Sequence, residues 1–205
     1  AKFTLRQETK YPWCGKIRFR FEDVENNVPF TLKLRIPGWL RKGKVSVNGA
    51  VVAELDKKSA ESYFDVRVED IANTVVELDM DLTPRLTIAH TKVEEDLNQV
   101  AVERGPLVYC VETMDSEAKD LGRIMIPVNA KFEESKMTIK GHELVTLETE
   151  GLTFEDDEWY DEDALYQTLD DTEVKPVKFR MIPYFAWDNR GMGEMIIWLP
   201  AFWGK

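Results

Sequence analysis

The sequence is poor in the side chains that build metal centres and nucleophilic active sites. It contains only two cysteines, Cys14 and Cys110, and two histidines, His90 and His142. Neither cysteine belongs to a CxxC pair, whereas a structural zinc site needs four ligands drawn mostly from cysteine and histidine. This inventory excludes a dense zinc site. A Cys14–Cys110 disulfide stays open, but we favour buried free thiols, because free cysteine is among the most buried residue types.

Further absences narrow the classes of function. There is no Gly-x-Ser-x-Gly elbow for a serine nucleophile, and no apolar run approaches the ~20 residues of a membrane-spanning helix. The 38 acidic residues outnumber the 27 basic ones, for a net charge of −11. A surface of this sign repels phosphate and anionic lipid, so we expect neither nucleic acid nor a membrane as a partner. The first residues have no signal-peptide core and are expected to continue an upstream segment; the compartment, bacterial cytoplasm or periplasm, stays open.

What the sequence does contain is apolar–polar alternation with a period of two, the pattern of half-buried strands. Turn signals separate these segments, among them Asn48-Gly49, the dipeptide most typical of a tight β-hairpin. The pattern predicts an all-β fold of antiparallel β-sandwich type, with a division near Lys92. A first group of strands is expected at 16–23, 29–39, 44–49, 63–70, 74–82 and 84–90, and a second group runs from 99 to the C-terminal region.

An acidic stretch at 154–174 has no period and is expected to be a surface loop. Its carboxylates lack the alternate spacing and central glycine of an EF-hand, so we favour a solvated loop over a calcium site. Glycoside cleavage needs two carboxylates on either side of one sugar, and no such pair is identifiable, although Glu158 adjoins Trp159 and Tyr160. We therefore predict no catalytic and no metal residues. The acidic residues in question are Asp156, Asp157, Glu158, Asp161, Glu162 and Asp163.

Six tryptophans are many for a chain of 205 residues. Buried tryptophans fill a core, whereas exposed ones stack on sugar rings. Trp198 lies in an apolar strand and is expected in the core. Trp13, Trp39 and Trp187 stand at turns, where we favour packing or an interdomain contact over sugar stacking.

Four segments together resemble the C-terminal part of glycoside hydrolase family 127, the β-L-arabinofuranosidase-like enzymes. They are TKYPWCGKIRFRF (9–21), PFTLKLRIPGW (29–39), VAVERGPLVYCVE (100–112) and IPYFAWDNRGMGEM (182–195). The resemblance extends from about residue 5 to 200 and is weakest through the acidic stretch. Cys14 departs from the family, which usually carries an acidic residue after Tyr-Pro-Trp, so Cys14 is not expected to be a family catalytic position.

The resemblance implies that the catalytic machinery lies elsewhere. In the family, an N-terminal (α/α)6 barrel carries the nucleophilic cysteine, the acid/base glutamate and a zinc ion bound by cysteines and a glutamate. Its Cys-Cys-Pro motif has no counterpart in this chain. No catalytic or zinc-binding role is therefore transferred to any residue here, and the chain is expected to bind no cofactor.

The resemblance also implies two jelly-roll-like β-sandwiches, the second inserted into the first. The first would comprise 1–91 plus 192–205, and the second 92–191. On this arrangement the last segment, EMIIWLPAFW, pairs with the sheet of residues 1–90.

One loop combines aromatic, amide and cationic side chains, namely Tyr184, Trp187, Asn189 and Arg190. With Trp13 and Trp39, these residues are the candidates for contact with a catalytic domain or a sugar. The alternative is a simple hairpin in which Arg190 pairs with Glu194 or Asp188. Elsewhere, Glu103 and Arg104 are expected to form an ion pair or cap at a strand end.

The predicted function is a non-catalytic β-sandwich module that supports an N-terminal catalytic barrel of a glycoside hydrolase and contributes to a homodimer. The alternative is a carbohydrate-binding module that holds plant-type oligosaccharides through exposed tryptophans. An independent hydrolase is disfavoured, because Cys-Cys-Pro is absent and histidines are few.

Overall fold

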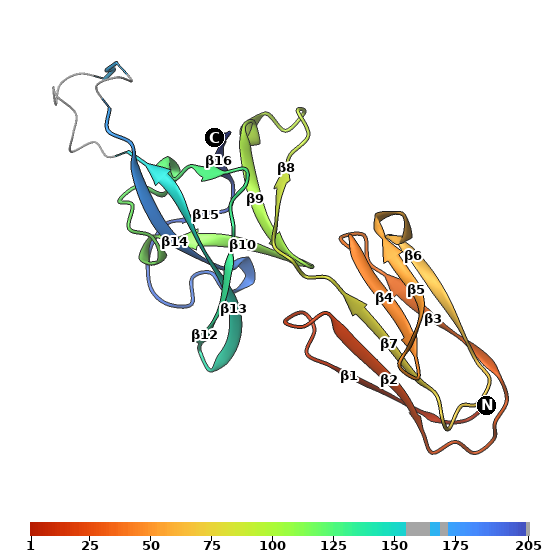
Figure 1. Ribbon diagram of the computed structural model, residues 1–205. Coiled ribbons are helices and arrows are strands. Elements are labelled where there is room, and N and C mark those ends of the chain that lie inside the picture. Colours follow the sequence, from red (N-terminus) through yellow and green to blue (C-terminus); the bar gives the residue numbers. More distant parts are fainter. Residues whose placement is uncertain (155–164, 169–171, 204–205) are drawn as a thin grey trace. The chain divides into compact units, whose positions relative to one another are not determined.

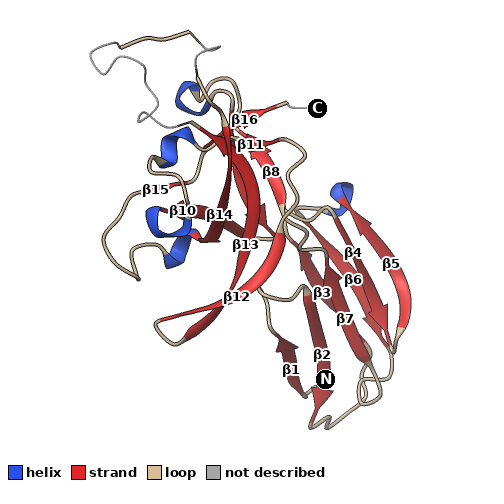
Figure 2. Ribbon diagram, turned by 60° about the vertical axis from the view of Figure 1, so that its left-hand side comes forward, coloured by secondary structure: helices blue, strands red, loops and turns tan. Residues whose placement is uncertain are grey.

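The computed structural model of the chain describes residues 1–154, 165–168 and 172–203. The described residues form strands joined by loops and by short 3-10 helices, as Figure 2 shows. This confirms the all-β prediction. The chain divides into two compact units, Ala1–Thr83 and Pro84–Lys205. No helix among the described residues is long and apolar enough to cross a membrane.

The first unit consists of two antiparallel sheets. Five strands form one sheet in the order β1-β2-β7-β4-β5, and the other sheet is the pair β3-β6 (Figure 1). The strands are β1 (Thr4–Thr9), β2 (Lys16–Glu22), β3 (Phe30–Ile36), β4 (Lys42–Val47), β5 (Ala50–Asp56), β6 (Ser62–Val68) and β7 (Val75–Met80).

The core of the first unit follows from the alternation in the sequence. Leu34 and Ile36 of β3, Val45 of β4 and Val76 of β7 are all at most 3% exposed and belong to one apolar cluster. Burying each such side chain stabilises the fold by about 1.5–3 kcal/mol. The predicted hairpin is confirmed at β4–β5, where Asn48 and Gly49 take φ of 51° and 84°, the left-handed values of a type I′ turn.

Two strands of the first unit, β1 and β5, were not among the segments predicted from alternation. All six residues of β1 are exposed, so neither face of this strand is marked by apolar residues. β1 is nevertheless in full register with β2, from Thr4 opposite Glu22 to Thr9 opposite Ile17. Backbone pairing at a sheet edge therefore formed a strand that side-chain periodicity does not indicate.

The second unit is organised around one nine-stranded sheet. The main path is β11-β16-β9-β10-β14-β13-β12, with β8 on β9 and β15 on β10. The strands are β8 (Arg85–Ile88), β9 (Gln99–Arg104), β10 (Leu107–Glu112), β11 (Ile126–Pro127), β12 (Glu133–Ile139), β13 (His142–Thr153), β14 (Lys175–Pro183), β15 (Met195–Ile196) and β16 (Leu199–Phe202).

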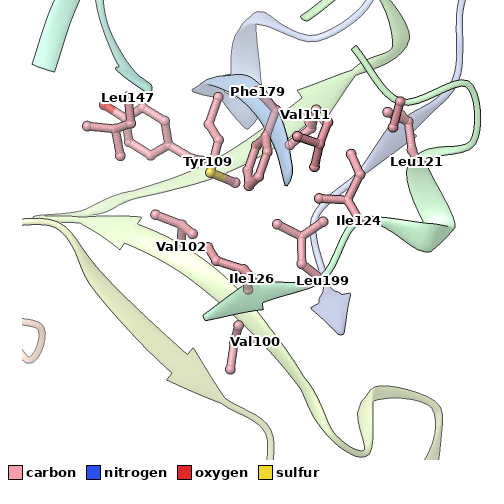
Figure 3. Packing of buried hydrophobic residues seen from close by; sticks show 13 residues of the cluster. Val100, Val102, Tyr109, Val111, Leu121, Ile124, Ile126, Leu147, Phe179 and Leu199 are labelled. Atoms are coloured by element: carbon pink, nitrogen blue, oxygen red, sulfur yellow. The ribbon is translucent and has the colours of Figure 1, made fainter. Parts of the chain in front are cut away.

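This sheet closes around its own core. Ile126 of β11 and Leu147 of β13 come from opposite parts of the strand order, yet both are fully buried in the same cluster. Figure 3 shows this cluster, with the Tyr109 and Phe179 rings among the aliphatic side chains. The Tyr109 hydroxyl donates a hydrogen bond to the carbonyl oxygen of Val145 at 3.0 Å, which satisfies the only polar atom of that side chain.

The prediction that the last strand returns to the sheet of residues 1–90 is wrong. β16 pairs antiparallel with β9 and parallel with β11, and β15 pairs with β10. Leu199 of β16 is fully buried in the core of the second unit. The units are therefore consecutive rather than inserted, because the apolar face of the last strand completes the core that β9 already lines.

The boundary between the two units also differs from the one expected near residue 91. β8, assigned in advance to the first unit, pairs with β9 from Arg85 opposite Glu103 to Ile88 opposite Val100. The Arg85 guanidinium also contacts the Glu103 carboxylate at 2.8 Å. The division consequently falls at Thr83 and Pro84. Alternation alone predicts a strand at 84–90 but carries no information about which sheet it joins.

Candidate functional site: an aromatic loop anchored by Arg190

The predicted loop follows β14 and leads towards β15. It begins with a single 3-10 turn, Tyr184–Ala186. Tyr184, Phe185 and Trp187 remain 44%, 60% and 41% exposed. The rings of Tyr184 and Trp187 are nearly parallel, with centroids 6.2 Å apart and planes inclined by 11°. We call residues 184–193 the aromatic loop.

Arg190 anchors this loop to β10 and to the short 3-10 turn that follows β10. Its Nε donates to Oε2 of Glu112 at 2.9 Å, and its Nη1 donates to Oδ1 of Asp115 at 3.0 Å. Nη2 contacts both carboxylates as well. The Arg190 side chain is 17% exposed and its partners only 4% and 3%. Charge-assisted hydrogen bonds between groups that are so well buried hold the loop in one position.

The same contacts fix the charge of the guanidinium. The hydrogen bonds from Arg190 to Asp115 and Glu112 raise the pKa of Arg190 above its ordinary value, although burial acts in the opposite direction. The two carboxylates therefore favour the cationic form of Arg190.

Local pairing of Arg190 with Asp188 or Glu194 is not what the structure shows. The Asp188 backbone N–H donates to Glu112 at 3.0 Å, and the backbone of Glu194 exchanges hydrogen bonds with Thr113. The partners of Arg190 precede it by 78 and 75 residues. A single sequence contains no pattern that would indicate an ion pair between residues so far apart in the chain.

Asn189 shapes the loop from within. Its side-chain Nδ2 donates to the carbonyl oxygens of Ala186 and Trp187, both at 3.1 Å. These two bonds close the turn that carries the Trp187 ring. Tyr184, Trp187, Asn189 and Arg190 thus lie together in one loop, and their contact with a catalytic domain or a sugar stays a prediction.

The other predicted aromatic residues belong to the first unit. Trp39 packs against that unit's core and stacks on Tyr11, with ring centroids 6.3 Å apart. Trp13 is half-buried in the turn before β2. Trp39 thus makes packing contacts within the first unit. Trp198, expected in the core, is only half-buried, because it lies in the bend between β15 and β16.

The remaining candidates are structural. Glu103 and Arg104 do not pair with each other, because consecutive strand residues point to opposite faces. Glu103 contacts Arg85, and Arg104, at 7% side-chain exposure, contacts Glu134 at 2.8 Å. His142 follows the turn at Gly141, and Nδ1 of His90 accepts a hydrogen bond from the Lys92 backbone.

Both cysteines are free thiols, Cys14 exposed and Cys110 buried. This agrees with the preference for free thiols, but Cys14 is not buried as expected. It lies in the turn before β2, outside the apolar clusters.

The described residues contain no group of three or more His, Cys, Asp or Glu side chains that could hold a metal ion. No described part of the chain therefore fits the zinc site that the family resemblance implies. The acidic residues 156–158 and 161–163, with Trp159, lie outside the described residues.

Comparison with known proteins identifies the family of both units. Residues 84–200 match the model of the glycoside hydrolase family 127 C-terminal domain, and residues 1–82 match that of the family's β-L-arabinofuranosidase middle domain. The border between these matches coincides with the border between the two structural units.

Individual relatives agree with this assignment. The non-reducing end β-L-arabinofuranosidase of Bifidobacterium longum subsp. longum is 30% identical over 200 residues, which are 94% of this chain and 29% of that protein. A solved glycoside hydrolase is 40% identical with a TM-score of 0.86, over 97% of this chain and 32% of its own. A family 127 β-L-arabinofuranosidase from Geobacillus stearothermophilus T6 is 32% identical with a TM-score of 0.84, over 98% of this chain and 31% of its own.

The chain thus spans about 30% of the length of these relatives. Because the family model of the C-terminal domain alone covers more than half of the sequence, the chain belongs to glycoside hydrolase family 127, of which it represents the middle and C-terminal domains.

Proposed function

We propose that this chain is the non-catalytic, all-β part of a β-L-arabinofuranosidase-like glycoside hydrolase, and that it supports an N-terminal (α/α)6 catalytic domain of the same protein. One observation carries the proposal: the chain matches the family's middle and C-terminal domains almost end to end, yet covers only 29–32% of its relatives. Most of each relative therefore corresponds to sequence other than this chain.

The aromatic loop is the surface that we assign to contact with the catalytic domain. Hot spots of protein interfaces are enriched in Trp, Tyr and Arg and are preorganised. Tyr184, Phe185 and Trp187 expose large aromatic surface, while the Arg190 anchor restricts the loop before any partner binds. The loop therefore loses little conformational entropy when a partner binds to it.

The first experiment tests the absence of catalysis. The 205-residue chain, incubated with an aryl β-L-arabinofuranoside, is expected to release no arabinose above the rate of buffer. The longer enzyme that contains both the chain and the catalytic domain serves as the positive control. Turnover by the chain alone, removed by heat denaturation, would contradict the proposal.

The second experiment tests the interface in that longer enzyme. Trp187→Ala should lower the midpoint of thermal unfolding of the catalytic domain, because contacts of that domain are lost. Tyr63→Ala is the matched control, since Tyr63 is a 64% exposed aromatic residue on β6. Equal midpoints for both variants and the unmodified enzyme would reject the aromatic loop as the interface.

A carbohydrate-binding module remains the second candidate, and the exposed, nearly parallel rings of Tyr184 and Trp187 favour it. Titration of the chain with arabinose oligosaccharides at millimolar concentration would then quench tryptophan fluorescence, and Trp187→Phe would remove the effect. Unchanged fluorescence would reject binding through the tryptophans. Homodimerisation also stays a prediction, which sedimentation velocity of the chain tests directly.

A further inference from the structure

The second unit carries a polar groove of about 750 Å³ that crosses β13 and β14. Two segments flank this strand pair. On the β14 side, the Glu117 backbone N–H donates to the Lys178 carbonyl oxygen, and on the β13 side, the Thr149 hydroxyl donates to the Lys131 carbonyl oxygen. The groove is lined by these two segments, 114–117 and 127–133, and by the strand pair between them. Volumes of about 300–1,000 Å³ are usual for small-ligand sites.

Two cross-strand ion pairs contribute to the lining of the groove. Glu148 lies opposite Arg180 in the register of the sheet, and Glu150 lies opposite Lys178. Their charged atoms are 3.0 Å and 3.4 Å apart. All four side chains keep 40–73% of their surface exposed, so their polar atoms can still bond to a ligand. The strand pair therefore presents hydrogen-bond acceptors and donors side by side.

The charge balance restricts the class of ligand. Five carboxylates line the groove against three cationic groups, an excess of two negative charges, which disfavours an anion. An apolar ligand would have to desolvate these charges without replacing their hydrogen bonds. Three of the five carboxylates already form ion pairs, Asp115 with Arg190, Glu148 with Arg180 and Glu150 with Lys178. A fourth, Glu117, accepts a hydrogen bond from the Lys178 backbone N–H at 3.4 Å. A cation would therefore have to compete with these partners for four of the five carboxylates.

A neutral polyhydroxyl compound is neither an anion, nor apolar, nor a cation, so none of these three objections applies to it. Each hydroxyl group both donates and accepts, so adjacent hydroxyls can donate to a carboxylate and accept from the paired ammonium or guanidinium without changing the charge balance. We propose that this groove binds a neutral oligosaccharide through the Glu148–Arg180 and Glu150–Lys178 pairs. No residue of the aromatic loop lines the groove, although Asp115, which does, pairs with Arg190 of that loop.

Isothermal titration of the chain with neutral arabinotetraose, xylotetraose and cellotetraose tests the proposal. Saturable binding of at least one tetrasaccharide is expected, with trigalacturonate and Ca²⁺ as charged comparisons that bind more weakly. The double variant Glu150→Ala, Lys178→Ala removes one recognition pair and should weaken binding by about tenfold or more. Because the pair is 67–73% exposed, the fold should tolerate its removal.

The matched control is Lys33→Ala, Asp65→Ala, which removes a cross-strand pair on β3–β6 that is 53–62% exposed and should leave the affinity within about twofold. The proposal is overturned if none of the three neutral sugars binds, if trigalacturonate or Ca²⁺ binds more tightly, or if the Glu150/Lys178 variant binds as the unmodified chain does. Loss of binding in Trp187→Ala alone would transfer the sugar to the aromatic loop. None of these outcomes affects the activity assay that tests the non-catalytic assignment.

Discussion

At the scale of single residues, Arg190 determines whether the aromatic loop has a fixed conformation. Two carboxylates, Glu112 and Asp115, are 4% and 3% exposed, and both form ion pairs with this guanidinium. Removing a partner from a buried ion pair leaves an uncompensated charge, which is far more costly than losing an exposed pair.

Arg190→Met is therefore expected to lower the free energy of unfolding of the chain by about 3–5 kcal/mol. Arg190→Lys keeps the charge but loses the forked geometry, so its loss should be intermediate. Arg67→Met is the control, because Arg67 and its partner Glu69 are 58% and 67% exposed; its effect should stay below about 0.5 kcal/mol. Urea denaturation followed by fluorescence measures all three, and equal losses at Arg190 and Arg67 would refute the role of the anchor.

The two thiols should differ in reactivity by environment. Burial first, and then the charges of Glu112 and Asp115, raise the pKa of Cys110 to about 12, so its thiol stays protonated and covered at neutral pH. A disulfide reagent at pH 7–9 should therefore modify one thiol per folded chain, and none in Cys14→Ser. Rapid modification of two thiols before unfolding would contradict this prediction.

The raised pKa of Cys110 also makes the free energy of unfolding decrease at alkaline pH. The unfolded Cys110 thiol releases its proton near pH 8.5, about three and a half units below the folded one, so the unfolded state binds fewer protons in this window. Unfolding is thus favoured as pH rises above about 9, by up to about 1.4 kcal/mol per pH unit. The stability difference between the unmodified chain and Cys110→Ser should narrow between pH 8 and 10, whereas Cys14→Ser should leave the slope unchanged.

At the scale of secondary-structure elements, close backbone approach decides where β2 and β7 meet. Gly15 precedes β2, and a Cβ built at this position would lie 1.8 Å from the carbonyl oxygen of Met80 at the end of β7. The Met80 N–H donates to the Gly15 carbonyl oxygen at 3.1 Å, so the two backbones cannot separate without losing that bond.

Gly15→Ala is expected to destabilise the first unit by about 1–3 kcal/mol, because β2 and β7 must move apart. Gly193→Ala provides the comparison, since its nearest non-neighbouring atom would lie at an ordinary 3.5 Å. Thermal unfolding should show a clear loss only for the Gly15 variant. Equal thermal unfolding midpoints for the Gly15→Ala and Gly193→Ala variants would mean that β2 and β7 can move apart at little cost.

At the scale of the whole molecule, each unit has its own core. The apolar cluster of the first unit includes only residues before 84, and that of the second only residues after 84. The last strands complete the second core rather than the first. Units of 83 and 122 residues are within the size range of independently folding domains.

The fragment 1–83 should consequently fold alone, with β-type circular dichroism and a cooperative thermal transition. Removing residues 195–205 from the full chain should unfold the second unit, because β9 and β10 lose paired strands and Leu199 leaves the core. The transition of the first unit should persist in that deletion. An unfolded 1–83 fragment would contradict a self-sufficient core in the first unit.

Much of the fold could be predicted because the information was local. Alternation placed β2, β3, β4, β6 and β7, and Asn48-Gly49 placed a hairpin, since each signal lies within a few neighbouring residues. Tyr184, Trp187, Asn189 and Arg190 could be placed in one loop because they are neighbours in sequence, whereas their functional role stays a prediction. The resemblance to family 127 rested on similarly short motifs and was confirmed.

What the tertiary structure alone decided concerns partners that are distant in the chain. The partners of Arg190, the sheet joined by β8 and by β16, and the groove across β13 and β14 all depend on residues brought together over tens of positions. A period-two pattern indicates that a strand has an apolar face. It does not indicate which core this face packs against, because any core of matching shape can bury it. The sequence by itself therefore determined most strands of the first unit and the family, whereas packing and long-range backbone pairing determined β1 and β5, the boundary between the two units and the geometry of both sites.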